Sequence, residues 1–129
     1  MEYFLLIEGV KMAKATFENF VKERFISPEL SDNQDARKIF EIINADANIE
    51  KAIELTRAGK PALLASVEEI ENYFESRGEN STFRLDEPRN CQLVGRMQRT
   101  VLAAFGYESK VNAPMESSYF HSAMTYRRA

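Results

Sequence analysis

Residues 86–105 read DEPRNCQLVGRMQRTVLAAF and form the clearest helical pattern in the sequence. Apolar residues of this stretch recur at helical spacing: Leu93, Met97, Val101, Ala104 and Phe105. Long polar side chains follow a separate face at positions i, i+3, i+7 and i+10: Arg89, Gln92, Arg96 and Arg99. We therefore predict a helix over residues 87–105 that buries one side and presents three arginines on another. Asp86 is expected to cap it, with Pro88 in its first turn and Gly106 at its end.

Three helices are predicted immediately upstream. The first spans about residues 32–43, with an apolar stripe formed by Ala36, Ile39, Phe40 and Ile43. The second follows a tight corner, is capped by Asp46 or Asn48, and closes at Gly59 before Lys60-Pro61. The third opens at Ser66, where serine with Glu69 three residues later forms a capping box, and it turns Val67, Ile70 and Phe74 inward.

The beginning of the chain allows two interpretations. Apolar residues keep helical spacing up to Arg24: Leu6, Val10, Ala13, Phe17, Phe20 and Val21. Gly9 weakens this helix, so residues 3–7 could form a short strand instead, with Thr16 capping a helix that begins later. In both cases Ser27-Pro28 ends the segment, because a residue before proline is pushed away from helical geometry.

The expected fold is mainly α: a single domain of about five helices. Residues 82–85 alternate enough for a short extended piece, and residues 107–111 could pair with it as a two-stranded element flanking the last helix. The order helix, turn, helix, hairpin resembles a winged-helix layout at the level of pattern alone. We expect a helical domain over residues 1–112 and a tail over residues 113–129 that is loosely packed or docked on a partner.

The composition leaves little room for catalytic or metal chemistry. The chain has one cysteine, Cys91, and one histidine, His121, so there is no disulfide, no multi-histidine site and no zinc-finger spacing. A nucleophilic cysteine needs a base and an orienting carboxylate, whereas Cys91 lies beside the apolar face, as a small core residue does. Acidic residues crowd helix starts and polar faces, and Gly59-Lys60 lacks the rest of a phosphate-binding loop. We expect no enzyme activity, no metal and no cofactor.

Charge is divided unevenly along the chain. Residues 1–83 carry a net charge of −6 and residues 84–129 a net charge of +3, which together give −3. Such asymmetry is typical either of two parts that attract each other or of a basic part with an anionic partner. No stretch is long and apolar enough for a membrane span, and the apolar run at residues 4–7 is too short for a signal peptide. We expect a cytoplasmic protein that does not contact membranes.

These observations favour a small regulatory or adaptor protein that works by binding. In the leading hypothesis it binds DNA: Arg89, Arg96 and Arg99 contact phosphates, and Gln92 reaches a base edge. The alternative is a protein-interaction module or homodimer, in which aromatic residues of the tail dock on a partner: Tyr119, Phe120 and Tyr126. Exposed arginines beside an uncharged groove would favour the first hypothesis, and arginines already paired with glutamates the second.

Overall fold

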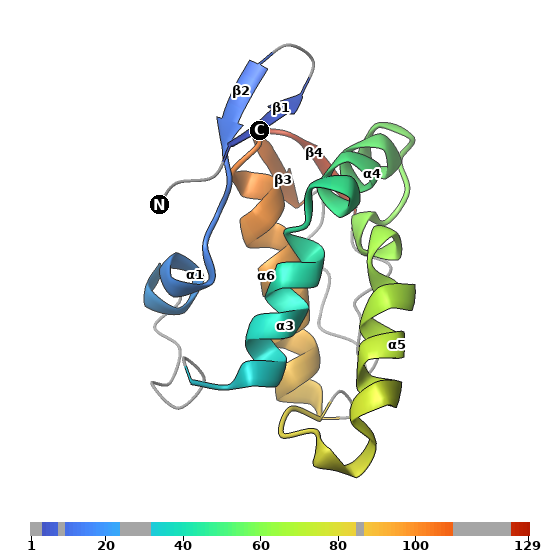
Figure 1. Ribbon diagram of the computed structural model, residues 1–129. Coiled ribbons are helices and arrows are strands. Elements are labelled where there is room, and N and C mark those ends of the chain that lie inside the picture. Colours follow the sequence, from blue (N-terminus) through green and yellow to red (C-terminus); the bar gives the residue numbers. More distant parts are fainter. Residues whose placement is uncertain (1–3, 8–9, 24–31, 85–86, 110–124) are drawn as a thin grey trace.

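A computed structural model describes residues 4–7, 10–23, 32–84, 87–109 and 125–129 (Figure 1). In these ranges the fold is mainly helical, as predicted. Two antiparallel strand pairs accompany the helices, one at each end of the chain. The elements in chain order are β1 Phe4–Ile7, β2 Val10–Ala13, α1 Phe17–Glu23, α3 Gln34–Ile43, α4 Asp46–Arg57, the 3-10 turn η1 Ala62–Ala65, α5 Val67–Arg77, the 3-10 turn η2 Gly78–Asn80, α6 Pro88–Ala103, β3 Tyr107–Ser109 and β4 Tyr126–Arg128.

Helix α6 is the central element of the helical body. It contacts α3, α4, η1 and β3, and Figure 1 shows it behind α3, with α5 to one side. From Phe17 onward, the large apolar residues of the predicted stripes belong to one buried cluster or pack against it, which confirms the stripes of α3, α5 and α6. The same cluster also takes in residues that the helical stripes did not include: Ile42, Ile49, Leu63, Phe83, Val94, Leu102, Tyr107 and Tyr126.

A buried carboxylate ties α3 to α5 and to the loop that follows it. Asp35 is 0% exposed and accepts hydrogen bonds from the Tyr73 hydroxyl and from the Thr82 backbone N–H at 2.7 Å. The Arg77 guanidinium donates to the same carboxylate at 3.0 Å. Burial alone would raise the pKa of Asp35, but the hydrogen bonds and the nearby positive charge outweigh it and lower that pKa below its ordinary value.

Most helix ends follow the predicted local signals, with two corrections. Asn33 caps α3, accepting from the Ala36 N–H at 2.9 Å. Helix α4 closes at Gly59, which has a φ of +73°, and the Lys60 N–H donates back to the Leu55 carbonyl, as in a Schellman motif. The start of α4, however, is capped by no side chain, so the expected cap by Asp46 or Asn48 is wrong.

The second correction concerns Ser66. It is the N-cap residue of α5, as predicted, but its side chain makes no capping hydrogen bond. Its hydroxyl is buried and has no partner among the described residues. The position of the helix start was therefore predicted correctly, while the capping box that was expected to fix it does not form. At α6, Glu87 is the N-cap residue and Pro88 begins the helix; Asp86, the expected cap, lies outside the described residues.

The first predicted helix is replaced by a hairpin and a shorter helix. Strands β1 and β2 pair antiparallel, from Phe4 opposite Ala13 to Ile7 opposite Val10. Helix α1 begins only at Phe17, and the Thr16 hydroxyl accepts from the Asn19 N–H at 3.1 Å. The alternative interpretation of a strand followed by a Thr16 cap is thus confirmed, and the continuous helix is wrong. The predicted end at Ser27-Pro28 lies outside the described residues.

The strand after α6 finds a different partner from the predicted one. Among the described residues, β3 pairs with β4 at the end of the chain and not with residues 82–85. Tyr107 lies opposite Arg128, and Ser109 lies opposite Tyr126. Residues 125–129, the end of the predicted tail, include strand β4 and the buried Tyr126, which is only 4% exposed. This part of the tail is therefore packed against the fold. The rest of the predicted tail, up to residue 124, lies outside the described residues.

Candidate functional site

The arginine face of α6 is narrower than its sequence predicts. Helix α6 buries the predicted apolar stripe and also residues outside that stripe: Val94, Gly95, Gln98 and Leu102. These residues are covered because α3, α4 and η1 all pack against the same helix. The helix therefore shows solvent only a thin strip, in which Arg89, Arg96 and Ala103 are exposed at a spacing of seven residues.

The four predicted site residues divide into two pairs. Arg89 and Arg96 are exposed, whereas Gln92 and Arg99 are half-buried. No carboxylate of a described residue forms an ion pair with Arg89, Arg96 or Arg99. The predicted face thus brings two solvent-exposed guanidinium groups to one strip, with Gln92 and Arg99 at its border.

Ion pairs between described residues lie elsewhere on the molecule. Within the first 83 residues the pairs are Lys14–Asp46, Arg37–Glu18 and Arg77–Asp35, and within the last 46 the pair is Arg127–Glu108. Each pair joins residues of the same part of the chain. Between described residues, the acidic helices of the first part form no ion pair with the arginines of α6, although such pairing was the competing explanation for the charge asymmetry.

Arg99 is half-buried and lies near Tyr126 of the C-terminal strand. Its Nε is buried without a hydrogen-bond partner among the described residues. Burial raises the pKa of Tyr126 to about 12, and the positive charge of Arg99 acts in the opposite direction. The half-buried Arg99 thus lies close enough to Tyr126 for its charge to act on that side chain, and it is less available to a ligand than Arg89 and Arg96.

The remaining predicted candidates have separate outcomes. Tyr126, expected to dock on a partner, lies in the core of its own chain. Tyr119, Phe120 and His121 lie outside the described residues. Cys91 is buried, 3% exposed, as expected for a small core residue. Among the described residues, no group of three histidine, cysteine, aspartate or glutamate side chains could hold a metal ion.

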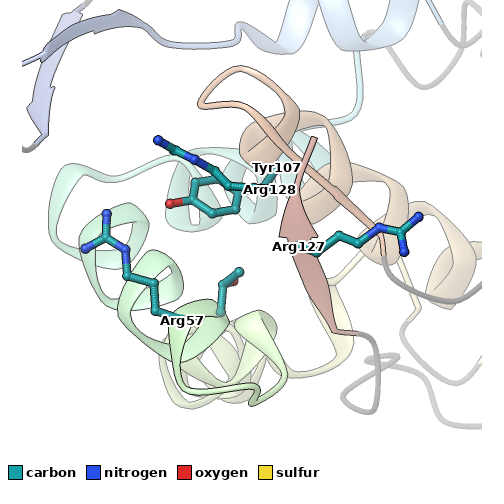
Figure 2. Close-up of a pocket in the computed structure, with 5 residues that line it drawn as sticks. Arg57, Tyr107, Arg127 and Arg128 are labelled. Atoms are coloured by element: carbon teal, nitrogen blue, oxygen red, sulfur yellow. The ribbon is translucent and has the colours of Figure 1, made fainter.

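A second group of arginines lines a pocket of about 380 Å³ between the end of α4 and the β3–β4 pair (Figure 2). Its lining consists of Thr56, Arg57, Tyr107, Arg127 and Arg128. The basic and aromatic character of the chain end was visible in the sequence, but Arg57 was not connected with it. Arg57 and Arg128 are far apart along the chain, and no local pattern indicates that they share a pocket.

Comparisons with known proteins give no relative: no family model, curated protein or solved structure matched the chain. A further finding concerns membranes. In the described ranges, each helix is too short or too polar to cross a lipid bilayer. Any functional conclusion therefore depends on the geometry and charge of the sites described above.

Proposed function

We propose that this is a non-enzymatic regulatory or adaptor protein that binds nucleic acid through the exposed strip of α6, with Arg89 and Arg96 as its main contacts. One observation carries the proposal: these two guanidinium groups are exposed and form no ion pair among the described residues, whereas Lys14, Arg37, Arg77 and Arg127 are engaged with carboxylates. An exposed guanidinium group suits a phosphate, which it can bind with two parallel hydrogen bonds.

The spacing of the two arginines fits a phosphate backbone. Residues of an α-helix rise by about 1.5 Å each, so Arg89 and Arg96 are separated by about 10 Å along α6. Phosphates on one DNA strand rise by about 3.4 Å each along the axis and also wind around it, so their direct separation is larger than this rise, and two arginines about 10 Å apart can reach neighbouring phosphates. Both arginines can thus contact the same strand without any bending of the helix.

This arrangement favours contact with the backbone over reading of bases. A recognition helix in the major groove needs several exposed side chains across a broad face. Most of α6 is buried, and Gln92, the residue expected to reach a base edge, is half-buried at the border of the strip. We therefore expect weak binding with little sequence preference, in which Arg99 contributes less than Arg89 and Arg96.

The alternative of a protein partner has less support. Of the large apolar side chains whose exposure is described, Leu64 alone is prominent at the surface, at 48% exposed. A stable protein interface has a core of several apolar or aromatic residues. Tyr126, one of the three aromatic residues proposed for docking, contributes to the chain's own core.

The test is a fluorescence-anisotropy titration of a labelled duplex of about 20 base pairs at low salt. Two contacts predict a salt dependence with a slope of about −1.8 in log K against log salt concentration. The double variant Arg89→Gln, Arg96→Gln should lose at least about tenfold in affinity, because it removes two charge-assisted contacts.

The matched control is Lys51→Gln, which removes an exposed positive charge from α4. It should bind like the wild type. Absence of binding by the wild type would exclude the nucleic-acid hypothesis. An equal loss in Lys51→Gln would show that overall charge, and not the strip of α6, governs the interaction.

A further inference from the structure

We propose that the pocket between α4 and the β3–β4 pair is a binding site for a small phosphate monoester, held by Arg57 and Arg128. This site uses other residues than the strip of α6 and does not depend on the proposed binding of nucleic acid. The strand register determines which side of β4 each arginine occupies.

Successive residues of a strand point to opposite sides, so Arg127 and Arg128 diverge. Arg127 lies opposite Glu108 in the register, and its Nε donates to the Glu108 carboxylate at 3.0 Å. Arg128 lies opposite Tyr107, and its guanidinium carbon is 5.5 Å from the centre of the Tyr107 ring. The charge of Arg127 is therefore balanced on one side, while Arg128 is held over an aromatic ring on the other.

Arg57 completes the site from the end of α4. Figure 2 shows the side chains of Arg57, Tyr107 and Arg128 extending to the same side of β4, and that of Arg127 extending to the opposite side. Two guanidinium groups and the Tyr107 hydroxyl thus face one mouth of the pocket. All of these groups can donate hydrogen bonds, which is what the oxygens of an anion require.

The end of a helix usually opposes an anion, because its free carbonyl groups carry partial negative charge. Here the backbone turn at Gly59 engages these carbonyls: Gly59 N–H donates to Thr56 and Lys60 N–H to Leu55.

A buried hydroxyl supports the presence of a ligand. Thr56 lines the pocket, is only 7% exposed, and its Oγ1 has no hydrogen-bond partner among the described residues. A buried polar group without a partner is uncommon in folded proteins and calls for an explanation.

The size and charge of the pocket select the class of ligand. A volume of about 380 Å³ is near the lower end of the range for small-molecule sites. A phosphate monoester carries between one and two negative charges near pH 7, since its second pKa is about 6. Its oxygens can accept from several donors at once, which suits the guanidinium groups and the Tyr107 hydroxyl of this pocket better than the two oxygens of a carboxylate do.

The test uses the full chain, isotopically labelled and titrated with inorganic phosphate and with ribose 5-phosphate while backbone amide shifts are recorded. We expect saturable shifts at Arg57, Tyr107 and Arg128. Arg57→Gln and Arg128→Gln should each weaken binding by at least about tenfold, because each removes a charge-assisted contact. Lys51→Gln is the matched control: it removes an exposed positive charge from α4, the helix that carries Arg57, outside the pocket lining, and should change affinity less than about twofold.

Several outcomes would overturn the proposal. One is the absence of saturable shifts in the wild type at millimolar phosphate, and another is an equal loss in Lys51→Gln. Tighter binding of succinate than of ribose 5-phosphate would assign the pocket to carboxylates instead. Urea midpoints of all three variants show whether a loss of affinity reflects unfolding. Tyr107→Phe removes only the hydroxyl and keeps the aromatic ring in the fold, so it should bind the phosphate ligand more weakly than the wild type. The double variant Arg89→Gln, Arg96→Gln should bind phosphate normally, which separates this site from the strip of α6.

Discussion

Gln98 is a polar side chain buried in the apolar core. It lies on α6, is 2% exposed, and neither its amide nitrogen nor its amide oxygen has a partner among the described residues. Its neighbours along the helix, Met97 and Val101, are fully buried core residues. An unpaired amide in such surroundings has lost its hydration without gaining a hydrogen bond, which costs about 1–3 kcal/mol.

Replacement of Gln98 by methionine should therefore stabilise the protein. The two side chains have similar length and volume, so the core keeps its packing while the unpaired amide is removed. We expect Gln98→Met to increase the free energy of unfolding by about 1–3 kcal/mol, measured by urea denaturation. Gln92→Met, at a half-buried position of the same helix, should change it by less than about 0.5 kcal/mol. A loss of stability in Gln98→Met would mean that the amide has a partner outside the described residues.

Asp35 is the opposite case, because its buried carboxylate is well satisfied. The lowered pKa of Asp35 means that the folded state favours the charged form. The resulting stabilisation is present above the unfolded-state pKa of about 3.9, and it is lost as the pH falls through the lower pKa of the folded state. Stability should therefore decrease in acid partly through this one residue.

Asp35→Asn tests this interpretation at the same side-chain size. It should lower the free energy of unfolding at pH 7 by about 2 kcal/mol, because charge-assisted hydrogen bonds from Tyr73, Thr82 and Arg77 become neutral or lose their acceptor. The variant should also show less loss of stability between pH 5 and pH 2 than the wild type, measured by urea midpoints at each pH. Glu50→Gln, which neutralises an exposed carboxylate on α4, serves as the control. An acid dependence in Asp35→Asn equal to that of the wild type would assign the effect to other groups.

At the scale of elements, sequence patterns were sufficient where structure depends on near neighbours. The stripe of Ala36, Ile39, Phe40 and Ile43 and the glycine at position 59 act within one or two helical turns, so α3 and the end of α4 were predicted closely. Strand pairing depends on distant residues. The alternation at residues 82–85 indicated a strand for β3 to pair with, but the partner is β4, whose sequence at Tyr126–Arg128 is too short to show a pattern.

The two candidate sites were predicted only in part for the same reason: sequence patterns report near neighbours and not contacts between distant residues. The spacing of Arg89 and Arg96 gave their common face, because helical periodicity is local. It could not show that Arg99 and Gln92 would be half-buried, since that depends on which elements surround α6. The pocket of Arg57 and Arg128 depends wholly on tertiary contacts between α4 and β4, and no short-range signal could have placed these residues together.

Strand β4 should be a structural element and not a dispensable tail. Tyr126 is buried in the core, whereas Arg127, next to it, points outward to an exposed ion pair with Glu108. Tyr126→Ala should lower the free energy of unfolding by about 3 kcal/mol, as large-to-small changes of buried aromatic residues do. Arg127→Ala should cost less than about 1 kcal/mol, because exposed ion pairs contribute little.

Both variants can be compared by thermal and urea unfolding monitored by circular dichroism. A chain truncated after residue 124 should resemble Tyr126→Ala or be less stable. If truncation leaves the melting temperature unchanged, the end of the chain does not contribute to the core in solution, and a tail docked on a partner becomes the better description.

At the scale of the whole molecule, the buried cluster extends through almost all of the described fold. It contains residues from α1, α3, α4, α5, α6, β3 and β4, from Phe17 to Tyr126. The aromatic rings of Phe17, Phe20 and Phe40 pack together and connect α1 to α3, with ring centres 5.6–6.2 Å apart. A core shared by all these elements leaves none of them an apolar cluster of its own, so they should lose their structure together.

We therefore expect a single cooperative unfolding transition. Far-ultraviolet circular dichroism reports the helices, and tyrosine fluorescence reports the environment of side chains, since the chain has no tryptophan. The two probes should give the same urea midpoint in the wild type. Phe20→Ala in α1 and Leu102→Ala in α6 remove fully buried side chains from two different helices, and each should cost about 2–5 kcal/mol. Because the core is shared, each variant should lower the midpoint of both probes by the same amount. Two separate transitions, or a Phe20→Ala variant in which only part of the helical signal shifts, would show that α1 unfolds independently and that the core consists of two parts.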